Sequence, residues 1–244
     1  MNDEKIVLCI PGLWKDRSEL IEAVARKSDG FILAGNYISK LKEDTDSFFE
    51  VELDGYNEQL AEAFEIAGNG TFSKKELSTL KKHSLTIYLI GEGGSFHKIT
   101  KIVEVAYALL KAGGLGVKVE SSGVANTIEK WSKVNNANDM VELFECFVSV
   151  VEDTDFYYSC GMHCFGLPDV IAFKNQVSPS YAQELMQIFC LYSLIENPNL
   201  IDGSTFSIDE NSPSFILRQT SCRHFPEDDL FHNKYGIWAL VKKD

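Results

Sequence analysis

The sequence predicts a mixed fold of the α+β or α/β class, whose N-terminal half is ferredoxin-like. Short apolar runs typical of strands alternate with amphipathic stretches typical of helices along the whole chain. In residues 1–90 they follow the order β-α-β-β-α-β of the ferredoxin-like pattern, with one extra short helix. Residues 91–244 are expected to be a second α/β half that packs with the first as one compact unit, although no residue-level repeat relates them. With 244 residues, 45% of them hydrophobic, the chain can bury a substantial core without disulfide bonds.

Four strands and three helices are expected in the first half. The strands are predicted at residues 6–10, 31–34, 48–53 and 85–90. Asp16 with Glu19, and Ser73 with Glu76, have the spacing of a capping box, which predicts that a helix begins at each place. A longer helix is predicted between them, over residues 56–67, because its apolar side chains share one stripe.

The second half begins with a predicted crossover unit. Apolar residues within 99–110 share one helical face, and a glycine pair ends that helix before a strand at residues 115–119. A strand, a helix of this length and another strand normally form a right-handed unit with parallel strands. We therefore expect the ends of strands 85–90 and 115–119 to open side by side at one edge of a sheet.

The remaining elements of the second half are predicted from caps and apolar runs. Ser121 or Ser122 is expected to open a helix that runs toward Trp131, and the Asn-rich segment 135–138 is expected to interrupt it. A long helix is predicted to begin at Ser178, which precedes a proline. Further strands are predicted at residues 144–151, 156–165, 205–208, 215–218 and 237–241.

Composition and charge restrict the possible partners. The formal net charge is -13, from 23 basic and 36 acidic residues, and the basic residues form no large cluster. Nucleic-acid binding is therefore not expected, because it depends on grouped lysine and arginine side chains. The six cysteines are dispersed through apolar segments, which suits reduced thiols and a cytoplasmic location. Neither a membrane-length apolar stretch nor a signal-peptide pattern is present, so no membrane contact is expected.

Three segments carry a resemblance to a known family: IPGLWKDRSEL near the N-terminus, AYALLKAGGLGVKVESSG ahead of Trp131, and YYSCGMHCFGLPD. The chain resembles an uncharacterised bacterial family of the domain-of-unknown-function kind, and its most distinctive segments are the GLGVKVESSG and YYSCGMHxxGLPD-like ones. The resemblance implies a soluble bacterial α/β protein. It brings no catalytic residue, cofactor or substrate with it.

Two turns that follow predicted strands form the candidate ligand site. Each turn joins a strand end to a helix start, where free backbone N–H groups and the helix dipole favour an anion. Gly93, Ser95 and His97 belong to the first turn, and Ser121 and Ser122 to the second. The glycines match neither a P-loop nor a dinucleotide fingerprint, so no cofactor is predicted. The alternative interpretation is that these residues are ordinary turns and helix caps.

The segment YYSCGMHCFGLPD holds the densest group of reactive side chains in the sequence. Cys160 and His163 are candidates for a thiol nucleophile and its base. A zinc site would need Cys164 and a fourth ligand from Cys222 or His224, and no standard zinc spacing is present, so no metal is predicted. The remaining interpretation is structural, with buried thiols that pack as small hydrophobic groups. In an extended strand the imidazole would face away from the two thiols, so a helical turn would be needed to bring them together.

The sequence favours a function in binding over one in catalysis. No recognised nucleophile, metal or nucleotide motif is present, so we expect a cytoplasmic protein that binds a protein partner or a small anionic ligand. The alternative is a hydrolase or transferase-type enzyme that uses Cys160 and His163. A third hypothesis is self-association through an aromatic surface, and the oligomeric state is left open. The residues expected on that surface are Tyr157, Tyr158, Phe165 and Phe173.

Overall fold

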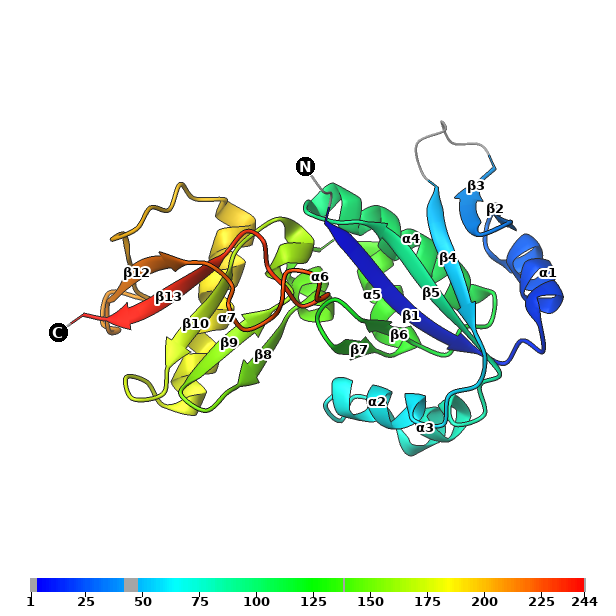
Figure 1. Ribbon diagram of the computed structural model, residues 1–244, viewed down its shortest axis with the longest axis horizontal. Helices are drawn as coiled ribbons and strands as arrows, with labels where there is room; N and C mark the ends of the chain where they lie inside the picture. The colour runs from blue at the N-terminus through cyan, green and yellow to red at the C-terminus, as the bar shows by residue number, and fades with distance from the viewer. Residues whose placement is uncertain (1–3, 42–47, 138, 244) are drawn as a thin grey trace. The chain divides into compact units, whose positions relative to one another are not determined.

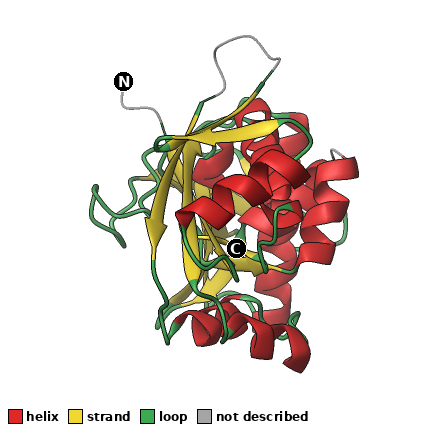
Figure 2. Ribbon diagram, turned by 90° about the vertical axis from the view of Figure 1, so that its right-hand side faces the viewer, coloured by secondary structure: helices red, strands yellow, loops and turns green. Residues whose placement is uncertain are grey.

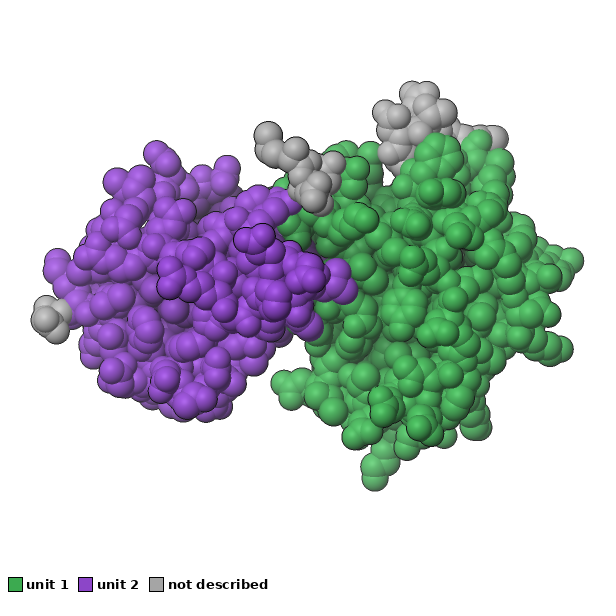
Figure 3. All heavy atoms as spheres, viewed as in Figure 1, with its two compact units in different colours: residues 1–146 green, residues 147–244 purple. Residues whose placement is uncertain are grey.

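The chain folds as two compact units. The computed structural model describes residues 4–41, 48–137 and 139–243. Unit 1 lies within residues 1–146 and unit 2 within residues 147–244 (Figure 3). Each unit has one β-sheet with helices packed on it, so the predicted mixed α+β class is confirmed. The units divide after residue 146, and not after residue 90 as expected, because two strands that follow residue 90 complete the first sheet.

Unit 1 is built on a seven-stranded sheet in the order β2-β3-β4-β5-β1-β6-β7. Its strands are β1 (Lys5–Gly12), β2 (Phe31–Ala34), β3 (Tyr37–Lys40), β4 (Phe49–Asp54), β5 (Leu85–Glu92), β6 (Val117–Val119) and β7 (Val124–Asn126). Every pair of neighbouring strands is antiparallel. Alternate side chains of the central strand β1, namely Ile6, Leu8 and Ile10, are fully buried and form the middle of the core.

Helices cover the two faces of this sheet unequally (Figures 1 and 2). They are α1 (Arg17–Lys27), α2 (Leu60–Ala67), α3 (Lys74–Leu80), α4 (Phe96–Lys111), α5 (Ile128–Ala137) and α6 (Met140–Phe147). The long helix α4 contacts β1 and β5, and α1 and α5 pack beside it. The short helices α2 and α3 pack on the opposite face, where Phe64 and Phe72 cover Cys9 and Ala125. The layer formed by α1, α4 and α5 is therefore larger than the layer formed by α2 and α3, and it holds most of the core.

The cap of α3 gives a first testable prediction. Ser73 accepts a hydrogen bond from the backbone N–H of Glu76, whose carboxylate accepts one from the backbone N–H of Ser73 at 2.8 Å. We expect Ser73→Ala to lower the free energy of unfolding by about 1 kcal/mol, because the backbone N–H of Glu76 loses its acceptor. Urea titration measures this loss. The control is Ser78→Ala, at an exposed position inside the same helix, which should not destabilise the protein.

The connectivity of unit 1 differs from the ferredoxin-like pattern in one respect. In that pattern the first strand pairs with the third, whereas here β5 lies between β1 and β4. Helices α2 and α3 contact each other and connect β4 to β5 as a helical hairpin. The chain therefore re-enters the sheet at the end where it left, and β5 must pair antiparallel with β4. The hairpin strand β3 was also not predicted.

Three other predicted elements need correction. Ser121 and Ser122 do not begin a helix, because they lie in a turn with Gly123, which has a φ of 72°. Helix α5 begins later, after Thr127, whose hydroxyl accepts a hydrogen bond from the N–H of Lys130 at 3.2 Å. The predicted interruption at 135–138 is not seen up to residue 137, where α5 ends, and Asn138 lies outside the described residues. The predicted strand 144–151 is replaced by α6 and a short strand, because its apolar residues recur at helical spacing.

Unit 2 is built on a six-stranded sheet in the order β11-β12-β13-β10-β9-β8. Its strands are β8 (Ser149–Glu152), β9 (Phe156–Cys160), β10 (Asp169–Phe173), β11 (Thr205–Phe206), β12 (Phe215–Thr220) and β13 (Ile237–Lys242). Only the central pair, β10 and β13, is parallel. A 3₁₀ turn, η1 (Met162–Phe165), follows β9, and the helix α7 (Pro179–Glu196) follows β10. The strand β10 was not predicted.

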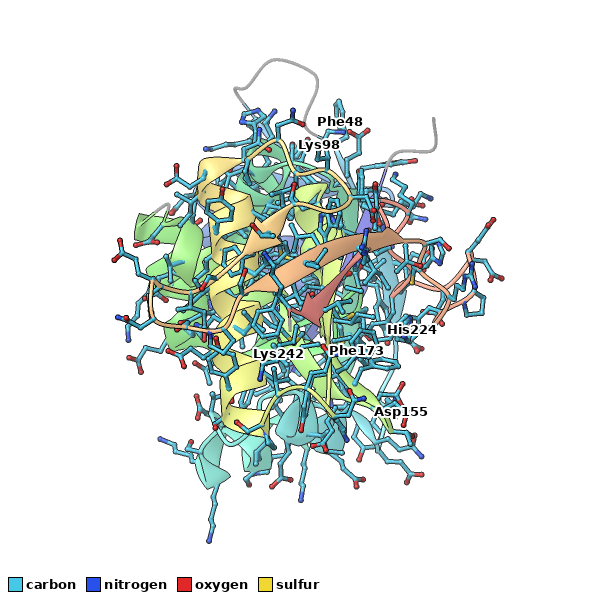
Figure 4. All side chains as sticks on the ribbon, turned by 90° about the vertical axis from the view of Figure 1, so that its left-hand side faces the viewer. Phe48, Lys98, Asp155, Phe173, His224 and Lys242 are labelled. Atoms are coloured by element: carbon cyan, nitrogen blue, oxygen red, sulfur yellow. The ribbon has the colours of Figure 1, made fainter. Side chains whose placement is uncertain are left out.

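The two faces of this sheet are covered differently. Helix α7 packs against β9 and β10, and on that face Val170, Ala172 and Leu240 are fully buried. The other face carries a smaller apolar cluster of Ile171, Ile237 and Ala239, with partly buried residues around it. Figure 4 shows the side chains of the chain, and Phe173 and His224 of this unit are labelled there. The segment between β12 and β13, which we call the 221–236 loop, packs on this second face (Figure 1).

Membrane insertion through a helix finds no support in this fold. Among residues 4–41, 48–137 and 139–243, no helix has both the length and the apolar character of a membrane span.

Candidate functional site

The turns that follow β5 and β6 lie at the same edge of the unit 1 sheet. Both strands pair antiparallel with β1, so they run parallel to each other with β1 between them. The N–H of Gly93 donates to the carbonyl of Glu4 at 2.7 Å, and the N–H of Glu120 donates to that of Val7 at 2.8 Å. The two strand ends therefore open toward one edge, but they are separated by a strand and are not neighbours as expected.

The side chains at this edge differ in their access to solvent. Ser95 caps α4 by accepting from the N–H of Lys98 at 3.3 Å, and His97 is exposed. Ser121 is fully buried and its Oγ accepts from the N–H of Val7 at 3.2 Å. Ser122 is also buried. Among the predicted ligand residues, therefore, the side chains of Ser95 and His97 can meet a ligand more readily than the two serines of the second turn.

In unit 2 the backbone turns sharply after Cys160. Strand β9 ends there, Gly161 adopts φ 122°, a conformation that side-chain-bearing residues rarely reach, and η1 follows. This is the helical turn that the sequence required if thiols and imidazole were to be grouped. Cys160, His163 and Cys164 are all buried, with His163 and Cys164 at 0% exposure. The reactive segment is thus part of the interior of unit 2.

Asp169, the first residue of β10, is the centre of a buried hydrogen-bond network. Its Oδ1 accepts from the hydroxyl of Ser159 at 2.8 Å and from the N–H of Met162 at 3.2 Å. Its Oδ2 accepts from the amide of Asn233 at 2.6 Å. The same Asn233 amide donates to the carbonyl of Leu167 at 3.0 Å. Since a buried carboxylate needs such donors, this network ties β9, η1 and the 221–236 loop to one side chain.

His163 lies against this network without joining it through a hydrogen bond. Its Nδ1 is 3.9 Å from Oδ2 of Asp169, too far for a hydrogen bond, and neither ring nitrogen has a hydrogen-bond partner among the described residues. Burial lowers the pKa of His163, but its neighbours Cys164 and Asp169 outweigh that effect and raise the pKa to about 11. The direction of this shift favours a protonated imidazole beside the carboxylate of Asp169.

Cys160 and His163 do not act on each other in this arrangement. Burial raises the pKa of the Cys160 thiol, and the negative groups around it, first Asp169 and then Cys164, raise it further. These effects disfavour the thiolate that a cysteine nucleophile needs. The charges that act on His163 come from Cys164 and Asp169 instead. The catalytic role predicted for Cys160 and His163 stays a prediction, and its chemistry would have to overcome this burial.

An open cavity of about 600 Å³ lies in the 221–236 loop, and we call it the outer cavity. All of its lining residues belong to that loop, including Cys222, Phe225, Glu227, His232 and Lys234. Nδ1 of His232 lies 3.0 Å from the carbonyl of Phe225. Because a carbonyl only accepts, Nδ1 carries a proton and Nε2 is left for other partners. The volume lies within the range typical of small-molecule sites.

A second, much smaller space lies deeper, and we call it the inner cavity. Its volume is about 10 Å³, which is roughly the space that one water molecule needs. Its walls come from β9, the start of β10 and the loop, and they include Cys160, Asp169, Cys222 and His224. The ring of His224 stacks on Tyr158 with centroids 5.8 Å apart. Cys222 is common to both cavities, so it lies between the loop surface and the buried network.

Within the described ranges, no group of three or more His, Cys, Asp or Glu side chains has an arrangement that could hold a metal ion.

Comparison with known proteins gives one family match, in unit 2. Residues 158–222 match a domain of unknown function, DUF4261. The predicted resemblance to a domain-of-unknown-function family is confirmed to that extent. The matched range contains nearly all of YYSCGMHCFGLPD and does not contain GLGVKVESSG. No curated protein and no solved structure matches the chain. The match assigns no activity, so the function has to be argued from the site.

Sequence reasoning missed the residues that hold this site together. Asp169 had a readable signal, since a lone acid directly before the apolar run VIAF must be buried or paired if that run is a strand. No signal in the sequence pointed to Asn233, because an asparagine in a polar loop is usually a surface residue. Ser159 was passed over beside the more conspicuous Cys160.

Proposed function

We propose that this protein works by binding a small anionic ligand in the outer cavity of unit 2. The observation that supports this proposal best is the cavity itself, about 600 Å³ in volume and walled by one loop. Lys234 offers the positive charge and the N–H donors that an anion needs, and Ser221 adds a hydroxyl. The buried network of Asp169 and Asn233 anchors the base of the loop, so the walls are held in place before a ligand arrives.

Glu227 gives this proposal its sharpest test, because its carboxylate lines the same cavity and repels an anion. A panel of amino acids, carboxylates, sugar phosphates and inorganic phosphate is screened for a rise in Tm, and hits are titrated by calorimetry. We expect Lys234→Ala to weaken binding of the best anion about tenfold or more, and Glu227→Ala to leave it unchanged or tighten it. Lys243→Ala, at an exposed position outside the loop, is the matched control.

Two results would contradict the proposal. One is a panel in which no anion binds the wild-type protein. The other is an anion whose affinity is the same in wild type and in Lys234→Ala, because its site would then lie elsewhere. Ser95→Ala and His97→Ala distinguish one such place, the edge of the unit 1 sheet. If they weaken binding, the anion is held by the turn at Gly93, Ser95 and His97, with Ser121 and Ser122 behind it.

We also propose that the protein is cytoplasmic. A protein partner is the alternative to a small ligand. All six cysteines are free, and five of them are buried, which suits a reducing compartment. The alternative function is a hydrolase or transferase-type enzyme, which requires turnover that is lost in Cys160→Ala or His163→Ala. Burial of the Cys160 thiol is the reason to rank this alternative second.

A further inference from the structure

Cys222 differs from the other five cysteines in its access to solvent. It is partly exposed, whereas the other five are buried. It lines the outer cavity, which is open, and it also lines the inner cavity. Cys160 lines the inner cavity alone. A small molecule that enters the outer cavity therefore reaches Cys222 first and meets Cys160 only behind it.

Cys222 and Cys160 line one small space. The inner cavity that they share has room for about one water molecule. The Cys222 charge is one of the causes that raise the pKa of Cys160, as expected for nearby groups of the same sign. Cys222 also packs on the cluster of Ile171 and Ile237, on the sheet face where the inner cavity lies. Both residues thus meet at one place in unit 2.

We propose that Cys222 and Cys160 are a redox pair, which a low-molecular-weight disulfide such as oxidised glutathione converts into an intramolecular disulfide bond. This site is independent of the anion proposed above, since it requires only that a small molecule reach the outer cavity.

The reaction proceeds in two thiol-disulfide exchanges. The thiolate of Cys222 attacks one sulfur of the small disulfide, which forms a mixed disulfide on Cys222 and releases one small thiol. Cys160 then loses its proton and attacks the Cys222 sulfur, which closes the protein disulfide, and the second small thiol leaves with that proton. Two protein thiols are oxidised and one small disulfide is reduced to two thiols. Cys222 takes the first step and Cys160 does not, because Cys160 is buried and burial raises the pKa of its thiol.

The Cys160–Cys222 disulfide bond would link the 221–236 loop covalently to β9. A disulfide needs its two Cβ atoms about 3.5–4.5 Å apart, so the bond would hold this part of the loop against β9 across the inner cavity. The outer cavity, whose walls are all in that loop, would then change shape. Oxidation would in this way control access to the outer cavity.

The test uses the full-length wild-type protein incubated with oxidised glutathione, quenched with acid, alkylated and digested. We expect mass spectrometry to find a Cys160–Cys222 linked peptide in most of the protein. In Cys160→Ser the expected product is glutathione retained on Cys222, because the second step is blocked. Cys164→Ser is the matched control, since Cys164 is buried nearby but does not line the inner cavity, and it should keep the full yield of the linked peptide.

Three outcomes overturn the proposal. The first is wild-type protein in which Cys222 is modified but never linked. The second is a link from Cys222 to Cys164 or Cys190. The third is a yield that falls in Cys164→Ser as much as in Cys160→Ser. Because the wild-type digest alone can give the first two, the test does not depend on the folding of any variant.

Discussion

Replacing Asp169 with alanine lowers the free energy of unfolding of unit 2 by about 3–5 kcal/mol, the range found when one partner of a buried charged group is removed. The side chain accepts hydrogen bonds from Ser159, Met162 and Asn233, and it lies near the cation of His163. Alanine leaves those donors and that charge without a partner in the interior. Hydrogen-exchange mass spectrometry of β9 and β10 peptides measures the loss of protection in unit 2.

A matched control separates the network from the loss of a negative charge. Asp228→Ala removes a carboxylate from an exposed position in the 221–236 loop, and we expect a change within about 0.5 kcal/mol. If Asp169→Ala is as mild as Asp228→Ala, the buried network does not hold the loop, and the preformed outer cavity loses its support.

His163→Gln destabilises the protein by an amount that depends on pH. The folded-state pKa of His163 is raised to about 11 from an ordinary value of 6.5, so between these values the folded protein holds one proton more than the unfolded chain. The stabilisation is fully present below pH 6.5 and is lost as the pH rises toward 11. We expect the stability difference between wild type and His163→Gln to shrink by up to about 1.4 kcal/mol per pH unit above pH 7.

Urea titrations of both proteins between pH 7 and about pH 10 measure this difference. Titrating groups that do not interact with His163 contribute equally in both proteins, and any change at its neighbours Cys164 and Asp169 is part of the effect measured. His97→Gln, at an exposed site, controls for the loss of a histidine as such. A difference that stays constant or grows with pH would show that His163 is buried as a neutral ring.

The fold could be predicted where local signals and packing agree. The capping serine at residue 73, the apolar stripe of α4 and the apolar runs of β1, β5 and β13 all specified the element that formed. The hairpin of β2 and β3 was missed because β3 reads YISK and lacks an apolar run, although Gly35-Asn36 is a turn signal. The strand order was beyond reach, since it depends on where the α2–α3 hairpin returns the chain.

Only part of the candidate site could be predicted from the sequence, and the reason differs from the one that applies to the fold. The sequence shows that Cys160, His163 and Cys164 are close along the chain, and it indicated correctly that only a helical turn could group them. It could not show that Asp169 and Asn233, which lie far apart in sequence, would meet at 2.6 Å. Nor could it show which thiol faces a cavity, because that depends on what the fold places over Cys222 and Cys160.

The place of β13 in its sheet has a consequence for how the chain is made. Residues 237–242 are synthesised after every other strand of unit 2, yet they lie in the middle, between β12 and β10. Until they leave the ribosome, β8–β10 and β11–β12 are separate fragments, each with an unpaired inner edge that another nascent chain can add to. Translation of unit 2 therefore ends with a vulnerable interval, in which a chaperone that shields strand edges would protect the yield of folded protein.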